Sequence, residues 1–201
     1  MKNEGANIYS VFDEILSKEE KEKMLNQRGR VLWLTGLSGS GKTTIAKELE
    51  KILHQQGFLT KLLDGDNIRA GINNNLGFSE EDRTENIRRI AEVSKLFLNC
   101  GVILINCFVS PTEQIRKQAK DIIGNENFIE IFIDTPLEVC EARDTKGLYA
   151  KARSGEVKNF TGISAPFEVP KNPNISVRTE SKTVEESTNE VVQYILPLIK
   201  A

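Results

Sequence analysis

The sequence is poor in the residues that most often build metal centres or disulfide frameworks, with one histidine and three cysteines in 201 residues. Cys100, Cys107 and Cys140 lack metal-site spacing and are odd in number, so we expect buried free thiols in a reducing compartment. His54 falls on a predicted helix and is interpreted as a surface residue. No apolar run is long enough to span a membrane, and the N-terminus lacks a signal-peptide layout. We therefore expect a cytoplasmic protein with no membrane partner.

The chain also lacks an excess of charge of either sign. It has 27 Lys and Arg against 29 Asp and Glu, a formal net charge of −2. This balance argues against a polyanion-binding surface, so nucleic acid is not an expected partner. No repeat or low-complexity segment is present. A hydrophobic content of 39% in a chain of this length predicts one soluble domain with a sizeable core.

Apolar runs and helical patterns alternate along the chain, which predicts an α/β fold with a parallel sheet covered by helices on both faces. Strands are expected near 31–35, 60–63, 102–109, 128–133 and 175–178, and helices near 42–56, 79–99, 112–123, 136–144 and after Thr183. Residues 1–28 are read as an N-terminal extension with one amphipathic helix on the main body, carrying Phe12, Ile15, Leu16, Met24 and Leu25. Residues 145–173 are read as a mobile lid.

The stretch 31–44, VLWLTGLSGSGKTT, is the most informative part of the chain. An apolar strand runs into a match to G-x-x-x-x-G-K-[ST], and a helical pattern follows, which is the context of a phosphate-binding loop. Its glycines let successive backbone N–H groups point at phosphate oxygens, and the helix adds its positive dipole end. The predicted ATP site comprises Gly36, Leu37, Ser38, Gly39, Ser40, Gly41, Lys42, Thr43 and Thr44. Lys42 is expected at the terminal phosphates and the Thr43 hydroxyl at Mg²⁺.

A second group of residues is predicted at the same edge of the sheet as the phosphate loop. Asp64 and Asp66 follow a predicted strand, where one carboxylate can hold the Mg²⁺ water shell and another can accept a proton from an attacking hydroxyl. We assign Asp66 both as a Mg²⁺-binding residue and as a catalytic residue. A helix capped by Ser79 carries Arg83, Asn86 and Arg89 at spacings of three, and one shared face would suit a second anionic ligand. A polar turn and a solvated helix face are the structural alternatives.

Several long runs resemble the adenylylsulfate kinase (APS kinase) family, namely GLSGSGKTT, LDGDNIR, LGFSEEDRTENIRRIAEVSKL, FVSP, IFIDTPLEVCEARDTKGLYAKARSGEVKNFTGI and PFEVPKNP. The resemblance covers nearly everything from Gly29 to the terminal helix. It implies a three-layer P-loop kinase fold over 29–201. It also implies transfer of the γ-phosphoryl group of MgATP to the ribose 3′-hydroxyl of adenylyl sulfate, in sulfate assimilation, by a homodimer.

The resemblance also implies roles for individual residues. Phe78 and Phe160 would sandwich the substrate adenine, a stacking role that both rings can fill. The phosphosulfate would be held by Arg69, Arg83 and Asn86, with Asp64 also on the substrate, Lys146 reaching in from the lid and Arg143 against the ATP adenine. Ser110 matches the position of a phosphoserine intermediate and is a candidate catalytic residue. A serine at a strand end before proline is equally a loop or cap residue, and direct in-line transfer needs no such intermediate.

Rival functions remain open at this point. Another small-molecule kinase on the same scaffold would need no paired aromatics. A non-catalytic module that senses adenylyl sulfate or its product would have no need of Lys42, Thr43 and Asp66. A GTPase switch is disfavoured because the sequence contains no N/T-K-x-D run for guanine recognition.

Overall fold

The computed structural model describes residues 9, 11 and 14–201. Its centre is a parallel five-stranded sheet in the order β2-β3-β1-β4-β5. The strands are β1 Val31–Thr35, β2 Thr60–Asp64, β3 Ile103–Cys107, β4 Phe128–Asp134 and β5 Ile175–Arg178. The predicted parallel sheet is confirmed, and each predicted strand lies within two residues of its observed bounds.

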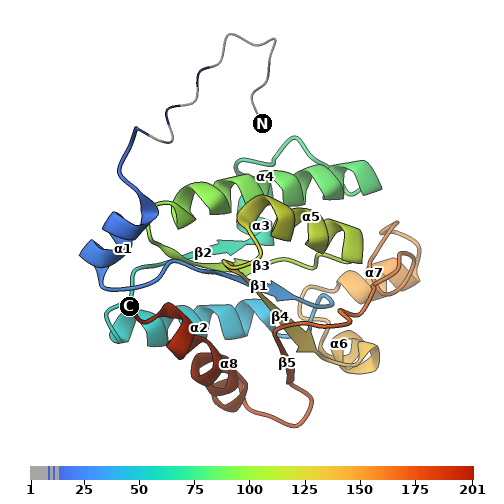
Figure 1. Ribbon diagram of the computed structural model, residues 1–201. Helices are drawn as coiled ribbons and strands as arrows, with labels where there is room; N and C mark the ends of the chain where they lie inside the picture. The colour runs from blue at the N-terminus through green and yellow to red at the C-terminus, as the bar shows by residue number, and fades with distance from the viewer. Residues whose placement is uncertain (1–8, 10, 12–13) are drawn as a thin grey trace.

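Helices cover both faces of the sheet (Figure 1). The helices of the described residues are α1 Lys18–Leu25, α2 Lys42–Gln55, α3 Gly65–Ala70, α4 Glu80–Leu98, α5 Glu113–Ile123, α6 Leu137–Arg143, α7 Leu148–Arg153 and α8 Val184–Ile199. α4 and α5 pack together on one face, and α2 and α8 pack on the other. This is the three-layer α/β architecture expected from the alternation of strands and helices.

The central strand β1 divides two hydrophobic cores. Leu32 and Leu34 belong to the core under α2 and α8, whereas Val31 and Trp33 belong to the core under α4 and α5. This alternation follows from the two-residue period of a strand, and burial on both faces explains the continuous apolar run. Trp33 is fully buried, with its ring centroid 5.6 Å from that of Phe108.

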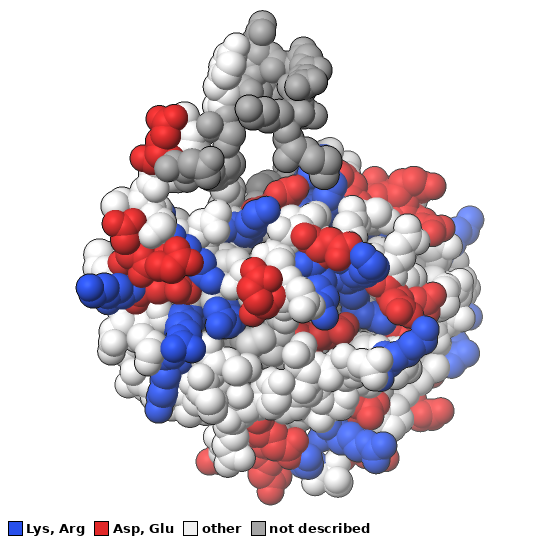
Figure 2. Space-filling view, viewed as in Figure 1, with Lys and Arg blue, Asp and Glu red and all other residues white. Residues whose placement is uncertain are grey.

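Helix ends follow the capping signals in the sequence. The Ser79 hydroxyl accepts from the Asp82 backbone N–H at 3.1 Å and begins α4. Thr183 and Glu186 form the predicted capping box at the start of α8. Among the described residues, no helix is both long enough and apolar enough to cross a bilayer. On the face shown in Figure 2, basic and acidic side chains are interspersed.

The N-terminal segment differs from its prediction. The described helix, α1, covers only Lys18–Leu25, has no buried residue, and leaves Ile15 and Leu16 exposed ahead of it. Phe12 lies outside the described residues. α1 is attached through polar contacts instead of an apolar face: Lys18 Nζ donates to Asn127 Oδ1 at 2.7 Å, and Lys21 Nζ to a backbone carbonyl. The sequence of this helix, KEEKEKML, is too polar to bury.

The cysteine prediction is confirmed in part. All three thiols are free, and Cys107 and Cys140 are buried. Cys100 is exposed, so its predicted burial is wrong. It lies in the tight turn between α4 and β3, where the chain reverses at the surface. His54 is exposed on α2, as predicted.

Candidate active site

A cavity of about 740 Å³ opens at the carboxyl edge of the sheet. In a parallel α/β sheet this edge gathers the loops that follow the strands, whatever their distance in sequence. The cavity is lined by most of the predicted site residues: Ser38, Gly39, Gly41, Lys42, Thr43, Thr44, Asp64, Asp66, Arg69, Phe78, Arg83, Asn86, Ser110, Arg143, Lys146 and Phe160. Gly36, Leu37 and Ser40 belong to the loop but not to the lining.

The loop between β1 and α2 has the backbone of a phosphate cradle. Gly39 and Gly41 adopt φ values of +74° and +103°, a region that side chains disfavour. A Cβ on Gly39 would lie 2.8 Å from the Cys140 carbonyl oxygen, so glycine is also required for the close approach of α6. The unbroken 14-residue helix α2 begins at Lys42 and directs the positive end of its dipole toward the loop.

Lys42 lies almost completely buried within this loop. Its Nζ donates to the Gly36 carbonyl at 2.8 Å and to the Leu37 carbonyl at 2.7 Å. Burial lowers the pKa of Lys42 from its ordinary value, because a desolvated ammonium is disfavoured. The side chain is thus held at the centre of the loop by carbonyls that a phosphate ligand can replace.

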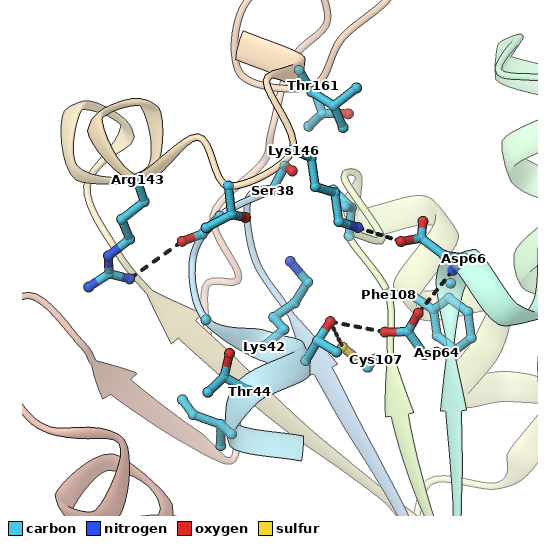
Figure 3. Close-up of a pocket in the computed structure, with 18 of the residues that line it drawn as sticks. Ser38, Lys42, Thr44, Asp64, Asp66, Cys107, Phe108, Arg143, Lys146 and Thr161 are labelled. Carbon is cyan, nitrogen blue, oxygen red and sulfur yellow. Dashed lines mark hydrogen bonds and ion pairs between the residues drawn. The ribbon is translucent and has the colours of Figure 1, made fainter. Parts of the chain in front are cut away.

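Side chains from the neighbouring strand ends hold the loop from behind. The Ser40 carbonyl accepts from Thr135 Oγ1 at 3.0 Å and from Thr179 Oγ1 at 3.2 Å. Arg143 Nη1 lies 3.3 Å from the same carbonyl and 3.4 Å from that of Gly39 (Figure 3). β4, β5 and α6 therefore all contribute to the rigidity of the loop.

The first residues of α2 meet the ends of β2 and β3. Thr43 Oγ1 donates to Asp64 Oδ2 at 2.9 Å and lies 3.4 Å from Cys107 Sγ (Figure 3). Burial raises the pKa of the Cys107 thiol to about 11, so it is neutral near pH 7. The carboxylate beside Thr43 is therefore Asp64, although the sequence assigned the metal to Asp66.

Asp66 lies two residues after Asp64, in α3, and faces the opposite wall of the cavity. Its carboxylate forms an ion pair with Lys146, from the loop between α6 and α7 (Figure 3). Its backbone N–H donates to Asp64 Oδ1 at 3.0 Å, which caps the short helix α3. The two carboxylates of the Asp-Gly-Asp run are thereby separated, one toward the phosphate loop and the other toward the far end of the cavity.

The far end is built from arginines and aromatic rings. The Arg69 guanidinium carbon lies 4.4 Å from the Phe78 ring centroid, within cation–π range. Phe78 is 61% exposed, so its ring is not part of the hydrophobic core. Arg83 Nη1 donates to Thr161 Oγ1 at 2.6 Å, and its Nε donates to the Phe78 carbonyl at 3.1 Å. Arg83 therefore joins the two loops that carry Phe78 and Phe160.

The predicted shared face of α4 is correct for two residues and wrong for the third. Arg83 and Asn86 line the cavity, and Asn86 Oδ1 accepts from Asn73 Nδ2 at 2.9 Å. Arg89 points elsewhere and pairs with Glu85 at 2.7 Å. Each step of three residues stops about 60° short of a full helical turn. Two such steps therefore place Arg89 about 120° away from Arg83 around the helix.

Ser110 lies at the end of β3 in a backbone conformation that is unusual for serine, with φ +45°. It is 2% exposed, and its hydroxyl accepts from the Trp33 indole N–H at 2.9 Å. Its carbonyl accepts from Arg116 Nη1 at 2.9 Å, and Arg116 pairs with Glu130 at 3.0 Å. The hydroxyl thus has a structural partner beneath the cavity floor.

Sequence reasoning missed several lining residues. Thr179 and the segment 182–184 follow β5, and their place after a strand on this edge was a usable signal. Tyr149 and Thr161 come from the 145–173 segment, and no local pattern distinguishes them. Tyr149 is fully buried, and its hydroxyl donates to the Ser38 carbonyl at 2.8 Å.

The fold and the site together define a P-loop kinase: a phosphate loop at one end of the cavity, a second ligand end opposite, and a carboxylate between them. The profile of the adenylylsulphate kinase family matches residues 28–178. The adenylyl-sulfate kinase of Phocaeicola vulgatus is 60% identical over 196 residues, 98% of this chain and 96% of that protein. The chain therefore belongs to the adenylylsulfate kinase family.

Solved structures agree with this assignment. The chain is similar to the Mycobacterium tuberculosis APS kinase in complex with AMPPNP and APS, with a TM-score of 0.81 and 43% identity, over 84% of this chain and 98% of that one. It is also similar to a hexameric APS kinase from Thiobacillus denitrificans, with a TM-score of 0.65 and 26% identity, over 86% of this chain and 30% of that one.

Proposed function

We propose that this chain is an adenylylsulfate kinase, which transfers the γ-phosphoryl group of ATP to the ribose 3′-hydroxyl of adenylyl sulfate. One observation carries the proposal: a single cavity has a phosphate loop at one end and an arginine-lined pair of phenylalanines, Phe78 and Phe160, at the other. A donor and an acceptor nucleotide need such a two-ended site, and phosphoryl transfer depends mainly on positioning and electrostatics.

At the donor end, the phosphate loop would hold the triphosphate through its backbone N–H groups. Lys42 Nζ, now bound to two loop carbonyls, would turn to the transferred phosphoryl group and neutralise its growing charge. Arg143 lies over the loop beside Thr179, and the wall formed by the two would receive the ATP adenine.

Magnesium fits the oxygen donors between the two ends. The Thr43 hydroxyl and the Asp64 carboxylate lie 2.9 Å apart, and hard oxygen ligands of this kind suit Mg²⁺, which takes few protein ligands beside substrate phosphates. We therefore assign its protein contacts to Thr43 and Asp64, with Asp66 left to the acceptor. When bound, Mg²⁺ would offset phosphate charge.

At the acceptor end, Phe78 and Phe160 would stack on the adenine of adenylyl sulfate. Arg69, Arg83 and Asn86 would hold its phosphosulfate, for which guanidinium groups have matched geometry. Asp66 would orient the 3′-hydroxyl and take its proton.

Lys146, which pairs with Asp66, comes from the 145–173 segment, which we propose as a lid that excludes water during transfer. Direct transfer leaves Ser110 a structural role, with its hydroxyl on Trp33.

Three free thiols fit a reducing, cytoplasmic setting. For the assembly we propose a homodimer on the strength of the family resemblance, whereas the similar protein of Thiobacillus denitrificans is hexameric. Light scattering of the purified chain would separate these two states.

The test is release of ADP from MgATP with and without adenylyl sulfate. We expect ADP formation to depend on adenylyl sulfate, with AMP as the matched control, since AMP carries the adenine but no sulfate. Equal ADP release in all cases, or turnover with gluconate or shikimate instead, would reject the proposal. Tight binding of adenylyl sulfate without any turnover would favour the non-catalytic sensor.

A further inference from the structure

Tyr149 contacts both ends of the cavity through one side chain. Its hydroxyl donates to the Ser38 carbonyl of the phosphate loop at 2.8 Å. Its ring packs edge-on against Phe160, with centroids 5.0 Å apart and an interplanar angle of 80°. Burial raises the pKa of Tyr149 above its ordinary value, so the phenol remains a neutral donor. The donor loop and an acceptor aromatic ring are therefore joined by one buried residue.

The phosphate loop does not depend on this contact. Its Ser40 carbonyl already accepts from Thr135, Thr179 and Arg143, which come from three different elements. Loss of the tyrosine hydroxyl would therefore leave the loop in place. It would also leave the Ser38 carbonyl, which is only half-buried, free to bind water.

The Phe160 turn, in contrast, is closed by its own hydrogen bonds. Its backbone N–H donates to Ser164 Oγ at 2.9 Å, and its carbonyl accepts from the N–H groups of residues 163–165. Outside the turn, Arg83 donates to the Asn159 carbonyl and to Thr161, and Gly162 lies close to Leu37 and Leu137. The Phe160 ring itself packs against Tyr149. The Phe160 ring therefore packs against a tyrosine that is itself hydrogen-bonded to the phosphate loop.

We propose that Tyr149 is a positioning residue that sets the Phe160 ring relative to the phosphate loop, and with it the placement of the acceptor nucleotide against the donor phosphates. This rests on the proposed function, because it takes Phe160 as a stacking partner of adenylyl sulfate. Tyr149 acts through Phe160 and the Ser38 carbonyl and touches no reacting atom.

The first variant is Tyr149→Phe, which keeps the ring and removes the hydroxyl. In calorimetric titrations we expect the affinity for adenylyl sulfate to fall about threefold to tenfold, the range for one lost hydrogen bond. The affinity for AMPPNP should change less than about twofold, since the loop has other supports. Tyr194→Phe is the matched control, because Tyr194 lies on α8, partly exposed and outside the cavity, and it should change neither affinity.

A double-mutant cycle with Phe160 separates this role from a general structural one. If Tyr149 acts through Phe160, then Tyr149→Phe should cost almost nothing in a Phe160→Ala or Phe160→Leu background, because contacting residues are not additive. Three outcomes would overturn the proposal. Tyr149→Phe could lower the affinity for adenylyl sulfate by the same factor in both backgrounds, it could leave that affinity unchanged in the otherwise native chain, or it could lower the affinities for both nucleotides equally.

The native chain decides the underlying function separately. If it neither binds nor turns over adenylyl sulfate, the proposed function fails, and this inference fails with it. If it does both and the cycle shows no coupling, only the role of Tyr149 is lost.

Discussion

The two ends of the cavity are built in different ways. At the phosphate-loop end, Lys42 is buried, and the Ser40 carbonyl accepts from donors just after β4, just after β5 and on α6. At the other end, Phe78 is exposed, and Arg83 donates to Thr161, which lies 78 positions further along the chain. The phosphate loop is itself one contiguous run that several distant side chains support, whereas the second end is assembled from separate segments that only tertiary packing brings together. The donor end should therefore tolerate loss of a distant contact better than the acceptor end.

The largest expected effect is at the donor end. Lys42→Ala should lower kcat by about a hundredfold to a thousandfold, because a charge-neutralising donor is lost at the transferred group. The free energy of unfolding should change little, since the lysine Nζ is bound only within the loop, to two carbonyls and the Ser40 hydroxyl. The measurement is steady-state ADP release together with thermal unfolding. Lys51→Ala, on the exposed surface of the same helix, is the control. Near-normal turnover in Lys42→Ala would remove it from the reacting phosphates.

The next effect tests whether the acceptor end is separate from the donor end. Phe160→Ala should weaken adenylyl sulfate binding about fivefold to two-hundredfold, the range for a base stacked on an aromatic ring, while ATP binding barely changes. Calorimetric titration of each nucleotide measures both affinities, and Phe97→Ala, on a partly exposed ring at the end of α4, is the control. Equal losses for both nucleotides, with a lower melting temperature, would instead make Phe160 an anchor of the loop.

The smallest expected effect on turnover is at Ser110, at the floor of the cavity between its two ends. Ser110→Ala should retain substantial activity, because direct transfer needs only the acceptor hydroxyl, Asp66 and the electrostatics of the loop. Stability should fall by about 1–3 kcal/mol, since the buried indole N–H of Trp33 loses its acceptor. Complete loss of turnover in a folded variant, with phosphoserine trapped in the native chain and detected by mass spectrometry, would show that transfer passes through Ser110.

Local sequence was sufficient for the five strands, for most of the helices and for the donor end, but it did not predict α3. The phosphate loop is one contiguous run whose conformation follows from its glycines, and the run from Val102 to Val109 indicated a buried parallel strand. Local patterns gave a wrong prediction in two places. The N-terminal apolar residues suggested a buried face that α1 does not have, and the spacing of Arg89 suggested a cavity contact that helix geometry does not allow.

The sequence by itself determined the order of strands and helices, the caps at Ser79 and Thr183, the phosphate loop and, through long runs resembling one family, the candidate acceptor residues. Those features depend on residues within a few positions of one another, or on the resemblance of long runs to one family. Tertiary structure alone decided that Asp64, and not Asp66, lies beside Thr43, and that Tyr149 reaches both Ser38 and Phe160. Parallel strands bring their carboxyl ends together regardless of sequence separation, so which side chains meet there depends on register and helix packing, which no short pattern records.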